Sequence, residues 1–309
     1  MLLLPTEVVM NKLQALLERS HVILADGAMG TMLFDAGLDS GDSPQAWNVT
    51  HPERVRAVHR AYLDAGSQII LSNTFGSNRF RLTRHNLQSQ VAELNRAGAA
   101  LVRAEVDNAG GRALVAGDVG PSGELLAPLG QLSFADAVDA FTEQAAALLA
   151  GGVDLIWIET MSSLQEVQAA IEGVRRSSAD VPIIATMTFE KHGRTMMGVS
   201  PQQAVNSLTD WGASAVGGNC GTGPKELLPV IQTMHGLAPA LALVFKPNAG
   251  VPELVDGKTR YNATAESMAG CALEAVREGA RVIGACCGGT PAHIRAMRDE
   301  LIGGAITQA

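Results

Sequence analysis

The sequence has no long run of lysine and arginine, no long apolar segment and few aromatic residues. Lysine and arginine number 23 against 31 aspartates and glutamates, which gives a formal net charge of −8. A negative chain without a basic run is a poor partner for nucleic acid or for an anionic membrane surface, so we expect neither partner. Nor does any segment approach the roughly 20 consecutive apolar residues that a membrane-spanning helix needs.

Features of an exported, disulfide-bonded protein are also lacking. The chain begins MLLLP without a basic region, and Pro5 and Glu7 interrupt its apolar start. Four cysteines in 309 residues do not make a disulfide framework. We therefore expect a cytoplasmic protein with reduced thiols, in which clustered cysteines indicate metal binding or catalysis.

Short apolar runs alternate with longer segments of helical periodicity. The apolar runs lack strict alternation, which is typical of strands buried on both faces of a parallel sheet. They occupy residues 21–26, 68–75, 113–120, 153–160, 182–189, 214–220, 241–248 and 281–288. The helical segments occupy residues 52–66, 89–108, 134–151, 163–178, 201–212, 225–237, 264–279 and 291–302.

This alternation predicts an α/β fold, a single (β/α)8 TIM barrel that spans residues 1–309 as one domain. Four segments, DAGSQII, AGGVDLI, DWGASAV and EGARVIG, repeat the order helix, glycine, strand. A doubly wound open sheet is the alternative. Residues 1–20 are expected to form an N-terminal helical extension, with an amphipathic helix at 6–19 that covers the bottom of the barrel.

Polar residues and cysteines gather where the apolar runs end. Active sites of such barrels form at the carboxyl ends of the strands, so these positions are the candidate site. They are Asp26, Asn73, Thr74, Asp118, Glu159, Thr160, Thr188, Asn219, Cys220, Lys246, Asn248, Cys286 and Cys287.

Three of these residues are cysteines at the ends of the sixth and eighth runs. Strands six and eight of a closed barrel are separated by one neighbour, about 10 Å, so Cys220 can meet Cys286 and Cys287. Three thiolates and one open position suit catalytic zinc, whereas ordinary core packing is the alternative. The flanking GGNCGTGP and GACCGG favour metal, because glycine permits close backbone approach and positive φ. Cys271 lies on an apolar helix face and is expected to pack in the core.

Two further segments leave alternatives open. Glu159 follows the apolar LIWI, so its carboxylate must be paired; it binds a substrate ammonium or forms a structural ion pair. DGAMGT (26–31) has neither the ending of a phosphate loop nor the spacing of a dinucleotide fingerprint. Its backbone N–H groups can instead receive a carboxylate.

Seven motifs in order along the chain carry a family resemblance. They are ADGAMGT (25–31), LSNTFG (71–76), GDVGPSGE (117–124), IWIET (156–160), GGNCGTGP (217–224), KPNAG (246–250) and GACCGGTPAHI (284–294). Together they resemble the homocysteine S-methyltransferase family, and most closely the homocysteine-binding module of cobalamin-dependent methionine synthase. Betaine–homocysteine methyltransferase is a more distant member. The resemblance covers roughly residues 20–302.

The resemblance implies specific roles for eight residues. Zinc is held by Cys220, Cys286 and Cys287, with no catalytic residue beyond these ligands. Substrate-binding positions match Asp26, Gly27, Thr31, Glu159 and Asn248. In the family, the asparagine that Asn248 resembles can fill the open zinc position before substrate arrives.

The implied activity is methionine formation by SN2 methyl transfer to a zinc-bound homocysteine thiolate. We expect the donor to be a methylated corrinoid, methylcobalamin, that arrives on a separate protein and is not bound permanently. Direct use of a small onium donor such as glycine betaine is the alternative. The betaine enzyme has aromatic residues where this chain has Thr160 and Gly76, although Trp47 and Tyr261 remain candidate walls of an aromatic cage. A non-catalytic corrinoid- or thiol-binding subunit is an alternative of another class.

Overall fold

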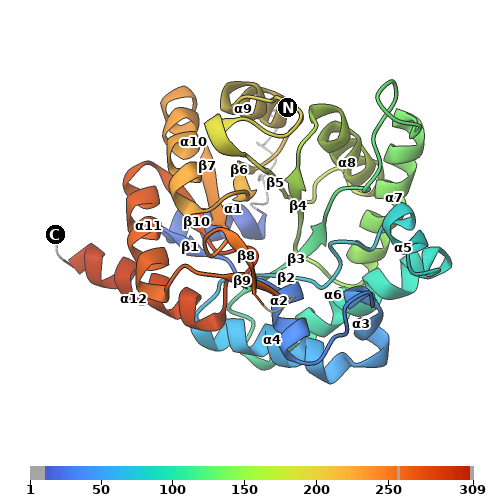
Figure 1. Ribbon diagram of the computed structural model, residues 1–309, viewed down its shortest axis with the longest axis horizontal. Coiled ribbons are helices and arrows are strands. Elements are labelled where there is room, and N and C mark those ends of the chain that lie inside the picture. The colour runs from blue at the N-terminus through green and yellow to red at the C-terminus, as the bar shows by residue number, and fades with distance from the viewer. Residues whose placement is uncertain (1–10, 256–257, 307–309) are drawn as a thin grey trace, which may run out of the picture.

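Eight parallel strands form a barrel in the computed structural model, which describes residues 11–255 and 258–306 (Figure 1). Their order around the barrel is β1-β10-β7-β6-β5-β4-β3-β2. The ring closes through a parallel bridge between Ala25 and Ile69, which joins the first strand to the second. The strands are β1 (Ile23–Leu24), β2 (Ile69–Leu71), β3 (Leu114–Val119), β4 (Leu155–Met161), β5 (Ile183–Met187), β6 (Ala215–Cys220), β7 (Ala242–Pro247) and β10 (Ala280–Ile283). The predicted (β/α)8 barrel is confirmed.

Helices surround the barrel, and local sequence signals fix several of their ends. Pro52, Pro201 and Pro291 each begin a helix, where a missing N–H is tolerated, and Gly66 ends one with φ of 105°. The main outer helices are α4 (Pro52–Ala65), α6 (Val91–Asn108), α7 (Phe134–Ala150), α8 (Leu164–Ser177), α9 (Pro201–Asp210), α10 (Pro224–Leu237), α11 (Ala265–Arg277) and α12 (Pro291–Ile306). All eight match predicted segments, and only α12 extends well past its predicted end.

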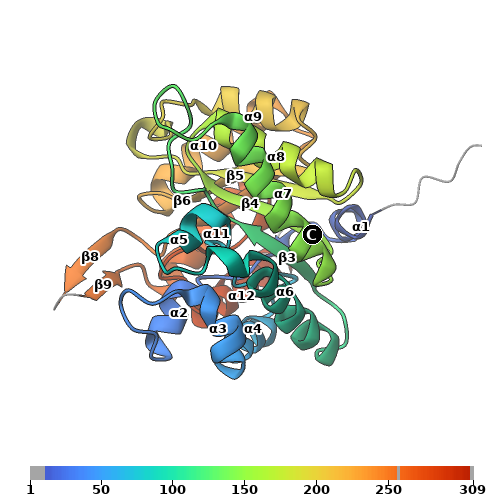
Figure 2. The same cartoon turned by 90° about the vertical axis from the view of Figure 1, so that its right-hand side faces the viewer.

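The lower end of the barrel, at the amino ends of the strands, is apolar and covered by helix α1 (Lys12–Arg19). In Figure 2 this helix lies on the side of the barrel away from strands β8 and β9. Its Leu13 and Leu16 are 1% and 0% exposed. They pack in one cluster with inward-facing side chains of the strands, among them Ile23, Leu114, Leu155, Ile184, Val244 and Val282. The predicted helix at the bottom is confirmed for residues 12–19, whereas residues 1–10 lie outside the described residues.

Period-two alternation decides what fills the upper end of the barrel. Leu114 and Ala116 of β3 face the interior, so Asp118 faces it too. Leu155 and Trp157 of β4 place Glu159 inside in the same way. The same rule turns Lys246 of β7 and Asn219 of β6 inward, above Val244 and Ala215. One alternating pattern therefore builds the apolar bottom and the polar top.

Several short elements were not predicted. The segment after β7 forms an antiparallel hairpin of β8 (Pro252–Val255) and β9 (Lys258–Tyr261), which projects from the barrel mouth (Figure 2). Its strands are too short and too polar to stand out in a hydrophobic pattern. The short helices α2 (Gly30–Asp35), α3 (Trp47–Thr50) and α5 (Arg79–Thr83) also lie in connections from strand to helix. Within residues 11–255 and 258–306, no helix has the length and apolar character needed to cross a membrane.

Candidate active site at the carboxyl ends of the strands

Three thiols converge at the rim of the barrel. The sulfur atoms of Cys220, Cys286 and Cys287 all lie within 4.8 Å of one another. The Cys220 Sγ is 2.9 Å from that of Cys286 and 3.8 Å from that of Cys287. The three cysteines form no disulfide. Three soft ligands at this spacing, partly open to solvent, match the donor set of a catalytic zinc site.

The backbone around the thiols is fixed by neighbouring loops. The Cys286 amide donates to the carbonyl of Pro247 at 2.7 Å, and the Ala249 amide donates to the carbonyl of Cys287 at 2.9 Å. Gly288 has φ of 77°, and a Cβ there would lie 2.3 Å from the Tyr261 ring. Hydrogen bonds from the other two thiols lower the pKa of Cys287 to about 3. One thiolate is therefore favoured even before any cation is considered.

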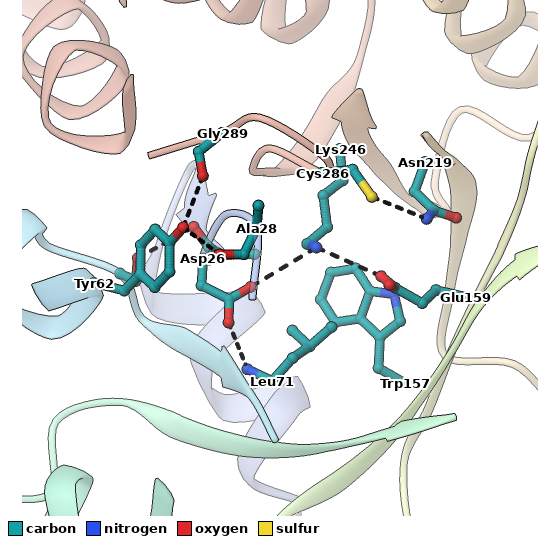
Figure 3. A network of polar contacts seen from close by, with 12 residues as sticks. Asp26, Ala28, Tyr62, Leu71, Trp157, Glu159, Asn219, Lys246, Cys286 and Gly289 are labelled. Carbon is teal, nitrogen blue, oxygen red and sulfur yellow. Dashed lines mark hydrogen bonds and ion pairs between the residues drawn. The ribbon is translucent and has the colours of Figure 1, made fainter. Parts of the chain in front are cut away.

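A buried cluster of charged groups lies beside the thiols, inside the barrel. The Lys246 ammonium sits 3.5 Å from Glu159 Oε2 and 3.8 Å from Asp26 Oδ1, between the two carboxylates (Figure 3). Burial raises the pKa of both Asp26 and Glu159 to about 7, although the nearby Lys246 charge opposes that rise. Burial alone would lower the pKa of Lys246, but the negative charges around it, Glu159 first, hold that pKa well above its ordinary value.

Some carboxylate oxygens in this cluster have no hydrogen-bond donor. Asp26 Oδ2 accepts from the Leu71 amide at 2.8 Å, whereas Asp26 Oδ1 is buried and accepts no hydrogen bond. Asp118, which is 6% exposed, likewise keeps a buried Oδ1 without a donor. Burial and then the Glu159 charge raise the pKa of Asp118 well above its ordinary value. Buried acceptors without donors are rare in folded proteins and favour a ligand that supplies the missing N–H groups.

Asn219 connects the thiols to the end of β4. Its Oδ1 accepts from the Thr160 amide at 2.8 Å, and its Nδ2 donates to Thr160 Oγ1 at 2.7 Å. The same Nδ2 lies 3.7 Å from the Cys286 sulfur. Thr160 and Cys220 adopt φ of 63° and 58°, in the left-handed region that a β-branched threonine strongly disfavours. Strain of this kind is retained mainly where surrounding bonds enforce it, and functional sites are frequent examples.

The end of β1 is held in place by close backbone contacts. A Cβ on Gly27 would lie 2.6 Å from the Gly289 carbonyl and 2.8 Å from the Tyr62 hydroxyl, so only glycine fits. The Ala28 amide donates to that Gly289 carbonyl at 2.9 Å. Tyr62 Oη lies 2.7 Å from the carbonyls of both Ala28 and Gly289, and burial raises its pKa well above the ordinary value. These contacts tie the first strand end to the loop that carries Cys286 and Cys287.

The two remaining expected site residues also present unpaired atoms. Asn248 donates from Nδ2 to the Gly221 carbonyl at 2.7 Å, and its Oδ1 is buried without a partner. Thr31 lies in the first turn of α2, and its buried Oγ1 has no partner either. All eight expected residues therefore lie at the strand ends or in the connections that follow them, Thr31 in the first turn of α2.

Sequence reasoning assigned no role to three residues of this site: Lys246, Asp118 and Asn219. Each was noted only as a polar residue at a strand end. The available signal was the alternation along each strand, since each of them is two residues beyond an inward-facing position. Lys246 is the ion-pair partner that the buried Glu159 carboxylate requires, at 3.5 Å.

The fold and the site together define a (β/α)8 barrel protein with a three-thiol cluster and a buried carboxylate cluster at its catalytic end. The model of the family described as homocysteine S-methyltransferase matches residues 23–301. This chain belongs to that family. The matched segment includes every residue of the candidate site.

Two methionine synthases and several solved structures are similar to this chain. Methionine synthases of Mycobacterium tuberculosis and Mycobacterium leprae are 33% and 32% identical over 294 residues, covering 89% of this chain but only 24% of those proteins. The chain thus spans about a quarter of the curated relatives' length. The homocysteine methyltransferase MmuM from Escherichia coli, solved in a metallated form, superposes with a TM-score of 0.80 at 28% identity and covers 94% of this chain and 99% of MmuM. A methyltransferase from Methanosarcina mazei, with a TM-score of 0.62 at 11% identity, shares the fold.

Proposed function

We propose that this chain is a zinc-dependent homocysteine S-methyltransferase that forms methionine. The observation that carries the proposal is the convergence of three cysteine sulfurs within 4.8 Å, beside a buried carboxylate cluster, in a member of this family. Cys220, Cys286 and Cys287 would hold the metal and leave one coordination position open for the substrate sulfur. When bound, zinc would lower the pKa of a coordinated thiol so that a nucleophilic thiolate persists at neutral pH.

The residues of the chain bind and orient the amino acid. Glu159 and Asp26 would receive the substrate ammonium, since both are buried and, among the residues that the structure describes, each is paired with no charged side chain other than Lys246. Backbone N–H groups of residues 26–31 and the unpaired Thr31 hydroxyl would receive the substrate carboxylate. Asn248, with its unpaired Oδ1, would occupy the open metal position until the substrate sulfur arrives. The homocysteine sulfur then attacks the donor methyl carbon in line, the bond to the leaving group breaks, and methionine forms.

Apolar side chains around the mouth support a donor carried by a protein. Met196, in the loop that follows β5, is 80% exposed, and Leu254, in strand β8 of the hairpin that follows β7, is 79% exposed. Eight large, exposed apolar residues lie on connections from the carboxyl end of a strand to the next outer helix: Phe34, Val49, Leu125, Leu129, Met196, Met197, Val251 and Leu254. Such a ring suits a macromolecular partner better than a small ion. We therefore propose that methylcobalamin is presented by a corrinoid protein.

Aromatic residues for a small cationic donor are scarce at the same mouth. An onium ion such as glycine betaine is best bound over several aromatic faces. Thr160 and Gly76 offer none, and the Trp47 ring is buried with the Arg54 guanidinium carbon 4.9 Å from its centroid. Trp47 is therefore not free to form a cage wall, which corrects its candidacy. Only Tyr261, near Cys287, remains from the candidate pair.

The test is direct turnover. Zinc-loaded protein is incubated with homocysteine and with methylcobalamin, a methylated corrinoid protein or glycine betaine, and methionine is measured by mass spectrometry. We expect methionine with the corrinoid donors and none with betaine. Rapid turnover with betaine in corrinoid-free protein would reverse the donor assignment.

A non-catalytic thiol- or corrinoid-binding subunit is the second candidate. The ring of exposed apolar residues fits it equally well, because that ring indicates only a partner. The two functions separate in the same assay: a binding subunit retains homocysteine and zinc but forms no methionine with any donor.

A further inference from the structure

The buried charges at the barrel mouth do not balance. Asp26, Asp118 and Glu159 are three carboxylates that are each less than 10% exposed, and Lys246 is the single buried ammonium among them. Removing an unpaired ionised group from water is strongly unfavourable, so such groups pair with a counterion or become protonated. A second cation bound at this cluster would relieve the imbalance.

Asp118 is positioned as a rigid part of this cluster. The Asp118 amide donates a hydrogen bond to Ser72 Oγ at 3.1 Å, and the Asp118 carbonyl accepts one from Thr74 Oγ1 at 2.8 Å. Gln144, from helix α7, donates to the Thr74 carbonyl at 2.9 Å. The strand end is thus fixed by its neighbours, while the carboxylate Oδ1 is buried and accepts no hydrogen bond.

The unpaired oxygens belong to side chains at the carboxyl ends of the strands, beside Glu159 and Lys246. Asp118 of β3 and Glu159 of β4 occupy inward positions near the ends of neighbouring strands, so the Asp118 carboxylate faces the same barrel interior as Glu159 and Lys246. Asp26 Oδ1 is the second buried oxygen without a donor. Glu159 holds Lys246 only at a long 3.5 Å and so retains accepting capacity. A primary ammonium has three N–H donors, and three buried carboxylates lie at this end of the barrel.

We propose that Asp118 is a third acceptor for the substrate ammonium, beside Asp26 and Glu159, and that this trio selects α-amino thiols over thiols without an amine. The proposal rests on the proposed function, since it extends the substrate contacts of the same site. Lys246 offsets one of the three charges, and the substrate ammonium offsets a second. The site then discriminates by charge: a thiol without an ammonium leaves the carboxylates under-compensated.

Calorimetry of zinc-loaded protein with two ligands tests the assignment. Homocysteine carries the ammonium, whereas 4-mercaptobutyrate is the same thiol acid without it. For Asp118→Asn we expect homocysteine affinity to fall about tenfold or more, because a charge-assisted hydrogen bond is lost. The affinity for 4-mercaptobutyrate should stay within about twofold of the unsubstituted protein's value on the same reasoning. Asp118→Ala should give the same pattern and serves if Asp118→Asn does not fold.

Glu105→Gln is the matched control. Glu105 is also a buried carboxylate, but it pairs with Arg56 and Arg60 on the outside of the barrel, at 2.6 and 2.9 Å. The Glu105→Gln substitution should lower thermal stability without changing the ratio of the affinities for homocysteine and 4-mercaptobutyrate. Unchanged homocysteine affinity in Asp118→Asn, or equal losses for both ligands, would overturn the role of Asp118. Failure of the unsubstituted protein to bind homocysteine would instead overturn the proposed function.

Discussion

The two ends of the barrel interior are built by the same strands and yet have opposite characters. At the lower end, Leu13 and Leu16 of α1 complete an apolar cluster made entirely of aliphatic, alanine and tryptophan side chains. Two residues further along the same strands, the inward positions hold Asp118, Glu159 and Lys246. The apolar cluster at the lower end therefore contributes to the stability of the fold and offers no charged group for binding or catalysis. The upper end carries unpaired charges that only a ligand would fully compensate.

Strain follows the same division. The non-glycine residues with positive φ include Thr160 and Cys220, which both lie at the carboxyl ends of strands. Buried oxygen atoms without partners at the mouth include those of Asp26, Asp118 and Asn248. Departures from local preference are expected where function requires them, and the rest of the structure must compensate.

The largest expected effect is loss of the metal site at the upper end. A Cys286→Ala/Cys287→Ala variant leaves one of the three sulfurs, so bound zinc should fall from about one per chain to almost none, and methionine formation should cease. Metal analysis and turnover measure both effects. Cys271→Ser is the control, because Cys271 packs partly buried against the core and should leave both unchanged. Full zinc retention in the double variant would refute the assignment of the ligands.

At the lower end, the expected effect falls on stability alone. Leu16→Ala removes a fully buried side chain from the contact between α1 and the strands. Such truncations cost about 2–5 kcal/mol of unfolding free energy. Chemical denaturation measures this loss, while homocysteine affinity and zinc content should match those of the unsubstituted protein. A large loss of homocysteine affinity at a temperature where Leu16→Ala is folded would show that the two ends are not independent.

A smaller effect is expected from removing one charge at the upper end. Glu159→Gln keeps the side-chain shape but loses the charge that we assign to the substrate ammonium. Charge-assisted hydrogen bonds contribute about 1.5–3 kcal/mol, so homocysteine affinity should fall about tenfold or more while zinc stays bound. Calorimetry and metal analysis provide the two readings. If affinity is unchanged, Glu159 serves only as the structural partner of Lys246.

The smallest expected effect is a pH dependence of selectivity. Burial raises the pKa of Asp26 and Glu159 to about 7, so both carboxyls are mostly neutral at pH 6 and mostly ionised at pH 8. Because only the ionised forms attract an ammonium, the preference for homocysteine over 4-mercaptobutyrate should rise as the pH rises from 6 to 8. The ratio of the two affinities cancels the titration of the thiol itself. A ratio that does not change with pH would contradict the role of these carboxylates.

The sequence predicted the lower end and the overall fold well, because both depend on repeated local signals. Buried apolar runs and first-turn prolines such as Pro201 can be recognised in the sequence without a structure. The three cysteines were also found, since their spacing and their glycines are unusual. The network of buried charges was not predicted from the sequence. Lys246 pairs with Asp26 and Glu159, which are 87 or more positions away along the chain. These residues come together because the barrel closes.

The hairpin of β8 and β9 marks the other limit of sequence reasoning. Its Tyr261 reaches the loop of Cys287 by packing against Gly288, a contact that depends on how a long connection folds back over the mouth. Short strands of mixed polarity have no periodic signal to identify them. Loops that finish an active site are therefore the part of such a protein that is least evident from its sequence.

The central claim is that the substrate sulfur joins the three cysteine sulfurs at the upper end of the barrel. X-ray absorption at the zinc edge counts the sulfur atoms around the metal directly. Without homocysteine, we predict three sulfurs at about 2.3 Å and one lighter ligand. With homocysteine bound, we predict four sulfurs at that distance. A sulfur count that stays at three in protein saturated with homocysteine would contradict the account.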